Sequence, residues 1–118
     1  MLENELRQAS NFSYIRNYKQ GTDLKMYQFD CSNKLKQHLV GFTYSVNLPI
    51  VDVNDISCYA VFDKNFECVM VRLNILQSEK LDAYVVDLTL EERQALTHTF
   101  RQEKGINLNK RKPLIMER

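Results

Sequence analysis

Polar and apolar positions along the chain follow two periods, one near 3.6 residues at both ends and one of two residues in the middle. At the start, apolar residues recur at helical spacing and predict a first helix over residues 2–10. The next segment, residues 11–20, can be read as a continuation of this helix up to Gly21 or as a strand. We favour the helix.

From Leu24 onward the period changes to two. Residues 25–31 and 38–46 alternate between two sets of side chains, as strands of an antiparallel sheet do. Pro49 cannot donate a hydrogen bond to a neighbouring strand, so it marks the exit from the second strand. Residues 82–88 predict a further strand near the end of the chain.

The segment from Ile56 to Leu76 predicts a β-hairpin with a three-residue turn that ends at Asn65 in the left-handed conformation. Phe62 then pairs with Phe66, and both faces of the hairpin become apolar. A sheet face in water should carry polar side chains, so the second face needs a cover. Barrel closure, a second sheet or another protein chain could supply it. The residues expected on this second face are Tyr59, Val61, Val69, Val71, Leu73 and Ile75.

The last helix has the clearest ends in the sequence, and we predict it over residues 90–104. Thr89 and Glu92 have the spacing of a capping box, in which each side chain bonds the other residue's backbone N–H. Gly105 is placed to end the helix in the left-handed conformation, with Ile106 folding back on it.

This order of elements predicts an α+β domain: an antiparallel sheet meander of about five strands with an N-terminal helix and a capped C-terminal helix. A partly closed β-barrel capped by the C-terminal helix is the alternative. The length of 118 residues suits a single domain, which we assign to residues 1–106, followed by a basic C-terminal tail over residues 107–118.

Composition is that of an ordinary globular protein, with 44% hydrophobic and 26% charged residues. No apolar run approaches the roughly 20 residues that a membrane-spanning helix requires. The first ten residues include Glu3 and Glu5 and lack the features of a secretory signal. We therefore expect a cytoplasmic protein without membrane contact.

Residues that carry chemistry are sparse. Cys31, Cys58 and Cys68 lie in apolar strand-like runs, which favours reduced core thiols. The two histidines and the cysteines lack the paired spacing of metal ligands, and three scattered glycines cannot build a phosphate-binding loop. We predict no catalytic, cofactor or metal site, and we do not expect an enzyme.

The formal net charge of +1 conceals an uneven distribution. Residues 7–38 carry six basic and two acidic side chains, residues 50–92 carry three and nine, and residues 107–118 carry four and one. Separated patches of opposite sign can steer the approach of a binding partner.

Together these features favour a non-enzymatic protein-interaction module, such as an inhibitor, an immunity protein or an assembly accessory protein. Its partner would be another protein chain, with a homodimer as one form, bound through the apolar sheet face and the charge patches. The residues expected to bind the partner are Tyr59, Val69, Val71, Leu73, Lys110, Arg111 and Lys112.

A single-stranded nucleic-acid binder, of RNA or DNA, is the alternative. Aromatic residues interleave with basic ones over residues 14–36, and aromatic rings stack on unpaired bases while cations follow the phosphates. The residues expected to carry this activity are Tyr14, Arg16, Tyr18, Lys19 and Lys25.

Overall fold

The structure is a computed structural model and describes residues 2–43 and 52–106. Two strands follow the first helix, and three more strands lie between the second α-helix and the last one. In chain order the elements are α1 (Leu2–Leu6), β1 (Ser10–Asn17), β2 (Lys25–Asp30), α2 (Asn33–Gly41), the short 3-10 helix η1 (Val53–Asp55), β3 (Ile56–Phe62), β4 (Cys68–Gln77), β5 (Lys80–Val86) and α3 (Leu90–Lys104).

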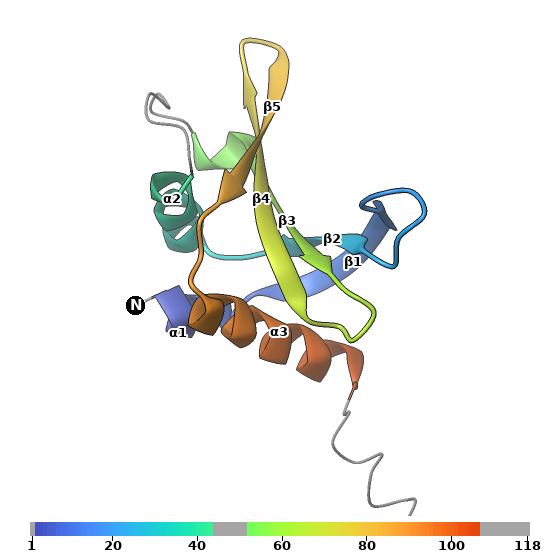
Figure 1. The fold of residues 1–118 in the computed structure, drawn as a ribbon. Coiled ribbons are helices and arrows are strands. Elements are labelled where there is room, and N and C mark those ends of the chain that lie inside the picture. Colours follow the sequence, from blue (N-terminus) through green and yellow to red (C-terminus); the bar gives the residue numbers. More distant parts are fainter. Residues whose placement is uncertain (1, 44–51, 107–118) are drawn as a thin grey trace, which may run out of the picture.

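The five strands form one antiparallel sheet in which each strand pairs with the next one along the chain (Figure 1). β1 and β5 lie at opposite edges, so the sheet is open and the barrel alternative is not adopted. The predicted α+β meander, with a helix before it and a capped helix after it, is confirmed.

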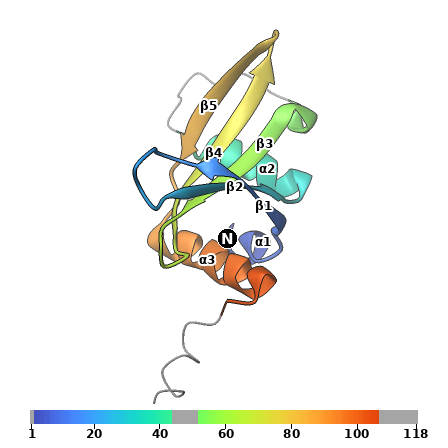
Figure 2. The same ribbon diagram turned by 90° about the vertical axis from the view of Figure 1, so that its right-hand side faces the viewer.

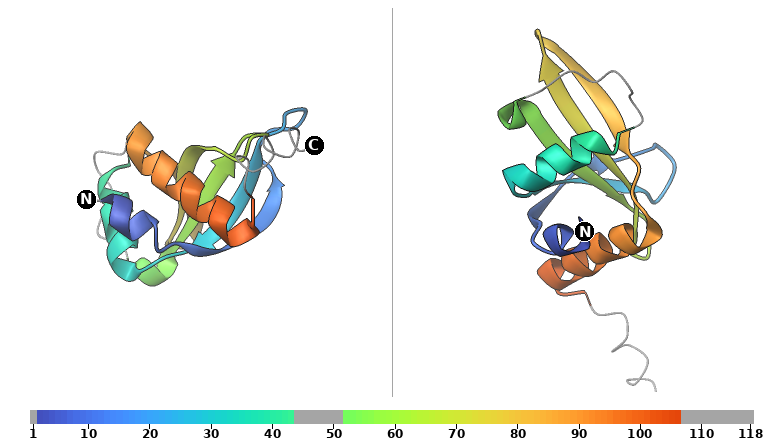
Figure 3. Two further views of the ribbon diagram at one scale, coloured as in Figure 1. Left: turned by 90° about the horizontal axis from the view of Figure 1, so that it is seen from below. Right: turned by 90° about the vertical axis from the view of Figure 1, so that its left-hand side faces the viewer.

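The helices gather on one side of the sheet (Figures 1 and 3). α1 packs against α3, α3 contacts β1 and β4, and α2 contacts α1 and η1. Figure 2 looks at the other side, where β1 and β2 lie in front and α2 lies behind the sheet. We call this side, which no helix of the described residues covers, the open face.

Aromatic rings form the centre of the core between the sheet and α3. The rings of Phe62 and Phe100 stack with their centroids 3.9 Å apart, and each residue is only 1% exposed. Phe12 meets Phe100 edge to face at 5.3 Å, and Tyr27 does so at 4.8 Å. This cluster joins β1, β2 and β3 to a single helix, so α3 packs against three strands at once.

The ends of α3 are those that the sequence predicts. The Thr89 side chain accepts a hydrogen bond from the Glu92 N–H, and the Glu92 carboxylate accepts one from the Thr89 N–H. Gly105 ends the helix with φ of 70°. The N–H of Ile106 donates to the carbonyl of Arg101 at 2.9 Å, and Ile106 packs against the core.

A helix forms at the start of the chain, but it is shorter than the predicted one over residues 2–10. Its favoured continuation up to residue 20 is wrong. α1 ends at Leu6, and the strand reading of the next segment is the correct one. β1 pairs with β2 through two register shifts, and Asn11 within it has φ of 56°. These bulges break the alternation that would have marked a strand in the sequence.

The strand expected over residues 38–46 is wrong for its described part, because α2 occupies the chain up to Gly41. The Ser32 hydroxyl caps this helix by accepting from the Leu35 N–H at 3.1 Å. Leu35 and Leu39, four residues apart, are buried as one helical stripe. Residues 44–46 and the predicted exit at Pro49 lie outside the described residues.

The predicted register of the hairpin at Ile56 is also wrong. Its loop has five residues rather than three: Phe62 pairs with Cys68, and Phe66, not Asn65, takes the left-handed conformation, with φ of 62°. A register shift follows directly, because Val61 pairs with Met70 and leaves Val69 unpaired. This bulge turns the later residues of β4 over to the opposite side of the sheet.

β5 confirms the strand expected over residues 82–88, with both bounds two residues earlier. It follows β4 through a two-residue turn at Ser78 and Glu79, whose φ values of 49° and 66° are both positive. That backbone geometry matches the right-handed twist of the two strands. β4 and β5 form a long ribbon that projects beyond the rest of the sheet (Figure 1).

Candidate interaction surface

The structure separates the seven residues that we expected to bind a partner. Val71 and Leu73, 1% and 0% exposed, face the helices and belong to the core, so the prediction for these two residues is wrong. Tyr59 is half-buried on the open face, and Val69 is exposed at the bulge. Lys110, Arg111 and Lys112 lie outside the described residues.

The expectation of two apolar faces fails because of the same bulge. Without it, Cys68 and Val71 would lie on opposite faces; with it, both face the helices. β4 then alternates in the ordinary way, with Arg72 and Asn74 directed to the open face between buried neighbours. That alternation is visible in the letters "VRLNIL" and could have revealed the true face.

A cross-strand row of side chains runs over the centre of the open face. Gln28 pairs with Tyr59, Tyr59 with Arg72, and Arg72 with Val85. The guanidinium of Arg72 lies over the Tyr18 ring, 5.6 Å from its centroid, in a cation–π contact. This row contains aromatic, amide and arginine side chains but no carboxylate.

Exposed apolar side chains continue the open face along the β4–β5 ribbon. Leu76 and Leu81 pair directly across the two strands, and Val85 lies farther along β5 on the same face. All three are exposed. We call Leu76, Leu81 and Val85 the apolar strip; our sequence reasoning did not select any of them.

The residues proposed for nucleic-acid binding all lie in the β1–β2 hairpin, but they do not form one surface. The Tyr14 ring packs against Tyr27 at 5.6 Å, and Tyr27 in turn contacts the core ring of Phe100. Burial and the neighbouring Tyr14 raise the pKa of Tyr27. Tyr18, by contrast, lies under Arg72 on the open face.

The basic residues of that hairpin are similarly divided. Arg16 pairs with Met26 on the open face, whereas Lys25 pairs with Phe62 on the side of the helices. Lys19 is exposed in the turn between the strands. A nucleic-acid strand following one face would therefore meet only part of this set.

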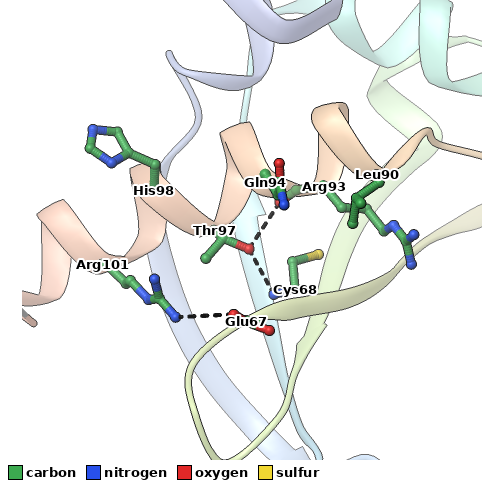
Figure 4. Close-up of a pocket in the computed structure, with 8 residues that line it drawn as sticks. All are labelled: Glu67, Cys68, Leu90, Arg93, Gln94, Thr97, His98 and Arg101. Atoms are coloured by element: carbon green, nitrogen blue, oxygen red, sulfur yellow. Dashed lines mark hydrogen bonds and ion pairs between the residues drawn. The ribbon is translucent and has the colours of Figure 1, made fainter. Parts of the chain in front are cut away.

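A pocket of about 270 Å³ lies between α3 and the start of β4 (Figure 4). Thr97 accepts a hydrogen bond from the Cys68 N–H at 2.8 Å, and the Arg101 guanidinium donates to the Asn65 carbonyl at 2.8 Å. Arg93 reaches the Val69 carbonyl at 3.4 Å. These contacts fasten the β3–β4 hairpin to the helix.

The chemical groups of this pocket do not form an acid–base pair. Burial raises the pKa of the Cys68 thiol to about 12, so the thiol stays protonated at neutral pH. The His98 ring is exposed and points away from Cys68 (Figure 4). General acid–base chemistry requires such groups within hydrogen-bond reach of each other.

Residues 2–43 and 52–106 contain no helix long and apolar enough to cross a membrane. Over the same ranges no three side chains among His, Cys, Asp and Glu gather as a metal site would require. His38 instead lies beside Glu5, with its Nδ1 3.1 Å from a carboxylate oxygen.

Comparison with known proteins adds no further constraint on this surface: no protein-family model, no curated protein and no solved structure matches the chain.

Proposed function

We propose that this protein is a non-enzymatic interaction module that binds a second copy of itself through the open face of its sheet. The observation that carries the proposal is the apolar strip: Leu76, Leu81 and Val85 are exposed together on a face that no described helix covers. Burying apolar surface contributes about 25 cal/mol per Å², so covering these side chains favours association.

The composition of the open face supports a protein partner. Beside the strip lie Tyr59, Met70 and Arg72, residue types that are enriched at the centres of protein interfaces. Lysine and carboxylates, which are depleted at such centres, do not occur in the row from Gln28 to Val85. Two such sheets can pack face to face with their side chains interdigitated.

Symmetry favours a particular arrangement of the two copies. Arg72 lies four residues from Leu76 on β4, about 13 Å at 3.3 Å per residue. A two-fold axis that crosses the ribbon at the Leu76–Leu81 pair therefore places the two Arg72 side chains about 26 Å apart, well beyond the screening length of about 8 Å. The Leu76–Leu81 pairs of the two copies then meet without repulsion between the Arg72 side chains.

Sedimentation velocity across a range of concentrations, from about 5 to about 200 µM, tests this proposal. We expect the wild type to shift from monomer toward dimer as concentration rises. Leu81→Glu should weaken the dimer by about tenfold or more, because it buries an unpaired charge. Leu90→Glu is the matched control: Leu90 is 56% exposed against 62% for Leu81, but it lies on α3.

A strictly monomeric wild type over that range would contradict the proposal, as would equal effects of the two substitutions. An inhibitor, an immunity protein or an assembly accessory protein would use the same face against a different chain. The expected cytoplasmic location stays a prediction.

Binding of single-stranded nucleic acid remains the alternative function, favoured by one observation: Tyr14, Arg16 and Lys19 are exposed on a single hairpin. Because the set is divided between two surfaces, we expect no binding to labelled single-stranded oligonucleotides at about 50 mM salt, where phosphate contacts are strong. Affinity that falls steeply with added salt and is lost in Arg16→Ala would favour this alternative instead.

A further inference from the structure

Two cysteines far apart in the sequence meet at the junction of β2, β3 and α2. Cys31 follows the last residue of β2, and Cys58 lies in β3, paired with Phe29. Their Sγ atoms are 3.7 Å apart, in a thiol–thiol hydrogen bond. A disulfide holds its sulfur atoms about 2.05 Å apart, so the two atoms are within about 1.7 Å of bonding distance.

The two thiols differ in their access to solvent and in their readiness to ionise. Cys31 is half-buried, whereas Cys58 is 1% exposed. The hydrogen bond from the Cys58 thiol lowers the pKa of Cys31, and Lys36 lowers it further, against the opposing effects of burial and Asp30. That same hydrogen bond, together with burial, raises the pKa of Cys58. The accessible sulfur is thus the one that becomes a thiolate.

Helix geometry adds to this asymmetry. Cys31 immediately precedes Ser32, the N-cap of the nine-residue helix α2. Lys36, in the first turn of this helix, is the cation that helps to lower the pKa of Cys31. The third cysteine provides an internal contrast, because Cys68 is buried against α3 and has no second thiol beside it among the described residues.

We propose that Cys31 and Cys58 are a redox-reactive pair, in which a small peroxide oxidises Cys31 and Cys58 then closes an intramolecular disulfide. In the first step the Cys31 thiolate attacks one peroxide oxygen and the O–O bond breaks, giving a sulfenic acid and hydroxide. In the second step the Cys58 sulfur attacks the Cys31 sulfur. The S–O bond breaks, the S–S bond forms, and the hydroxyl leaves as water with the Cys58 proton.

This pair does not involve the apolar strip, so the inference is independent of the proposed self-association. The disulfide would close a loop over residues 32–57 and link β3 covalently to the start of α2. Cys31 supplies the reactive thiolate and Cys58 the resolving thiol, a role that requires contact rather than exposure.

The test is limited oxidation of the folded full-length chain with hydrogen peroxide, followed by alkylation under denaturing conditions and mass spectrometry. We expect the wild type to lose about 2 Da and two alkylation sites, with a peptide that links Cys31 to Cys58. Cys68 should stay reduced during the oxidation and should therefore be alkylated afterwards. Cys68→Ser is the matched control and should form the same disulfide at the same rate.

The other variants separate the two roles. Cys31→Ser should form no intramolecular disulfide, while Cys58→Ser should leave Cys31 as a sulfenic acid that a dimedone probe captures. Circular dichroism of each variant checks that it remains folded. Three fully alkylated thiols in wild type, after exposure that oxidises free glutathione, would overturn the proposal; so would a disulfide that joins Cys68 or two separate chains.

Discussion

Replacing Phe100 by alanine should lower the free energy of unfolding by about 3 to 5 kcal/mol. Phe100 stacks on Phe62 at 3.9 Å and meets Phe12 and Tyr27 edge to face. The substitution removes a fully buried ring and leaves a cavity between α3 and three strands. The stability of a small domain is only about 5 to 15 kcal/mol in total, so we expect a large fraction of it to be lost.

Urea denaturation followed by circular dichroism measures this loss directly. Leu90→Ala is the control on the same helix, because Leu90 is exposed and its replacement should change stability by no more than about 0.5 kcal/mol. Phe100→Leu, which retains much of the volume, should fall between the two. If Phe100→Ala cost no more than Leu90→Ala, α3 would not pack against the sheet as described.

Loss of the Glu103 carboxylate should cost about 1 to 2 kcal/mol, because the part-buried Phe12 N–H loses its acceptor, whereas water can replace the acceptor of the exposed Asn11 N–H. One carboxylate oxygen accepts from the Asn11 N–H and the other from the Phe12 N–H, each at 2.7 Å. Asn11 has φ of 56°, and β1 is an edge strand. The last turn of α3 therefore supplies the acceptors for the bulged start of β1.

Urea denaturation of Glu103→Ala, with hydrogen exchange at residues 11 and 12, measures this effect. Gln102→Ala is the control, since Gln102 is exposed in the same turn and should change stability little. Glu103→Gln keeps one carbonyl acceptor and should retain part of the stability. Unchanged exchange at the two β1 amides in Glu103→Ala would show that this contact does not hold the strand.

The accuracy of the sequence predictions depends on how local their signals are. The ends of α3 were correct because Thr89, Glu92 and Gly105 act on neighbours within four residues. The predictions for β1 and α2 were wrong for a related reason: a helix was favoured where β1 lies, and a strand was expected over the end of α2. β1 owes its strand conformation to β2 and to Glu103, whereas the true local signal for α2, Ser32 with Leu35 and Leu39, was overlooked.

The candidate surface was harder to predict than the fold, because one bulge decides it. Because Val69 is unpaired, the side chains of Val71 and Leu73 point into the core and that of Arg72 points to the open face. A bulge arises from hydrogen bonds between strands, so the sequence does not contain the unpaired residue itself; it shows only the resulting alternation in "VRLNIL". The contact between Cys31 and Cys58, 27 residues apart, is of the same kind.

The sequence by itself determined the class of this protein: an α+β domain with five antiparallel strands, a helix before them and a precisely capped helix after them. Only the tertiary structure decided which segment supplies the first strand, which side chains of β4 reach solvent, and which thiols meet. Hydrophobic periodicity and helix caps depend on interactions between residues that lie within one or two helical turns of each other in the sequence. Register and faces depend on partners that the fold brings together from a distance.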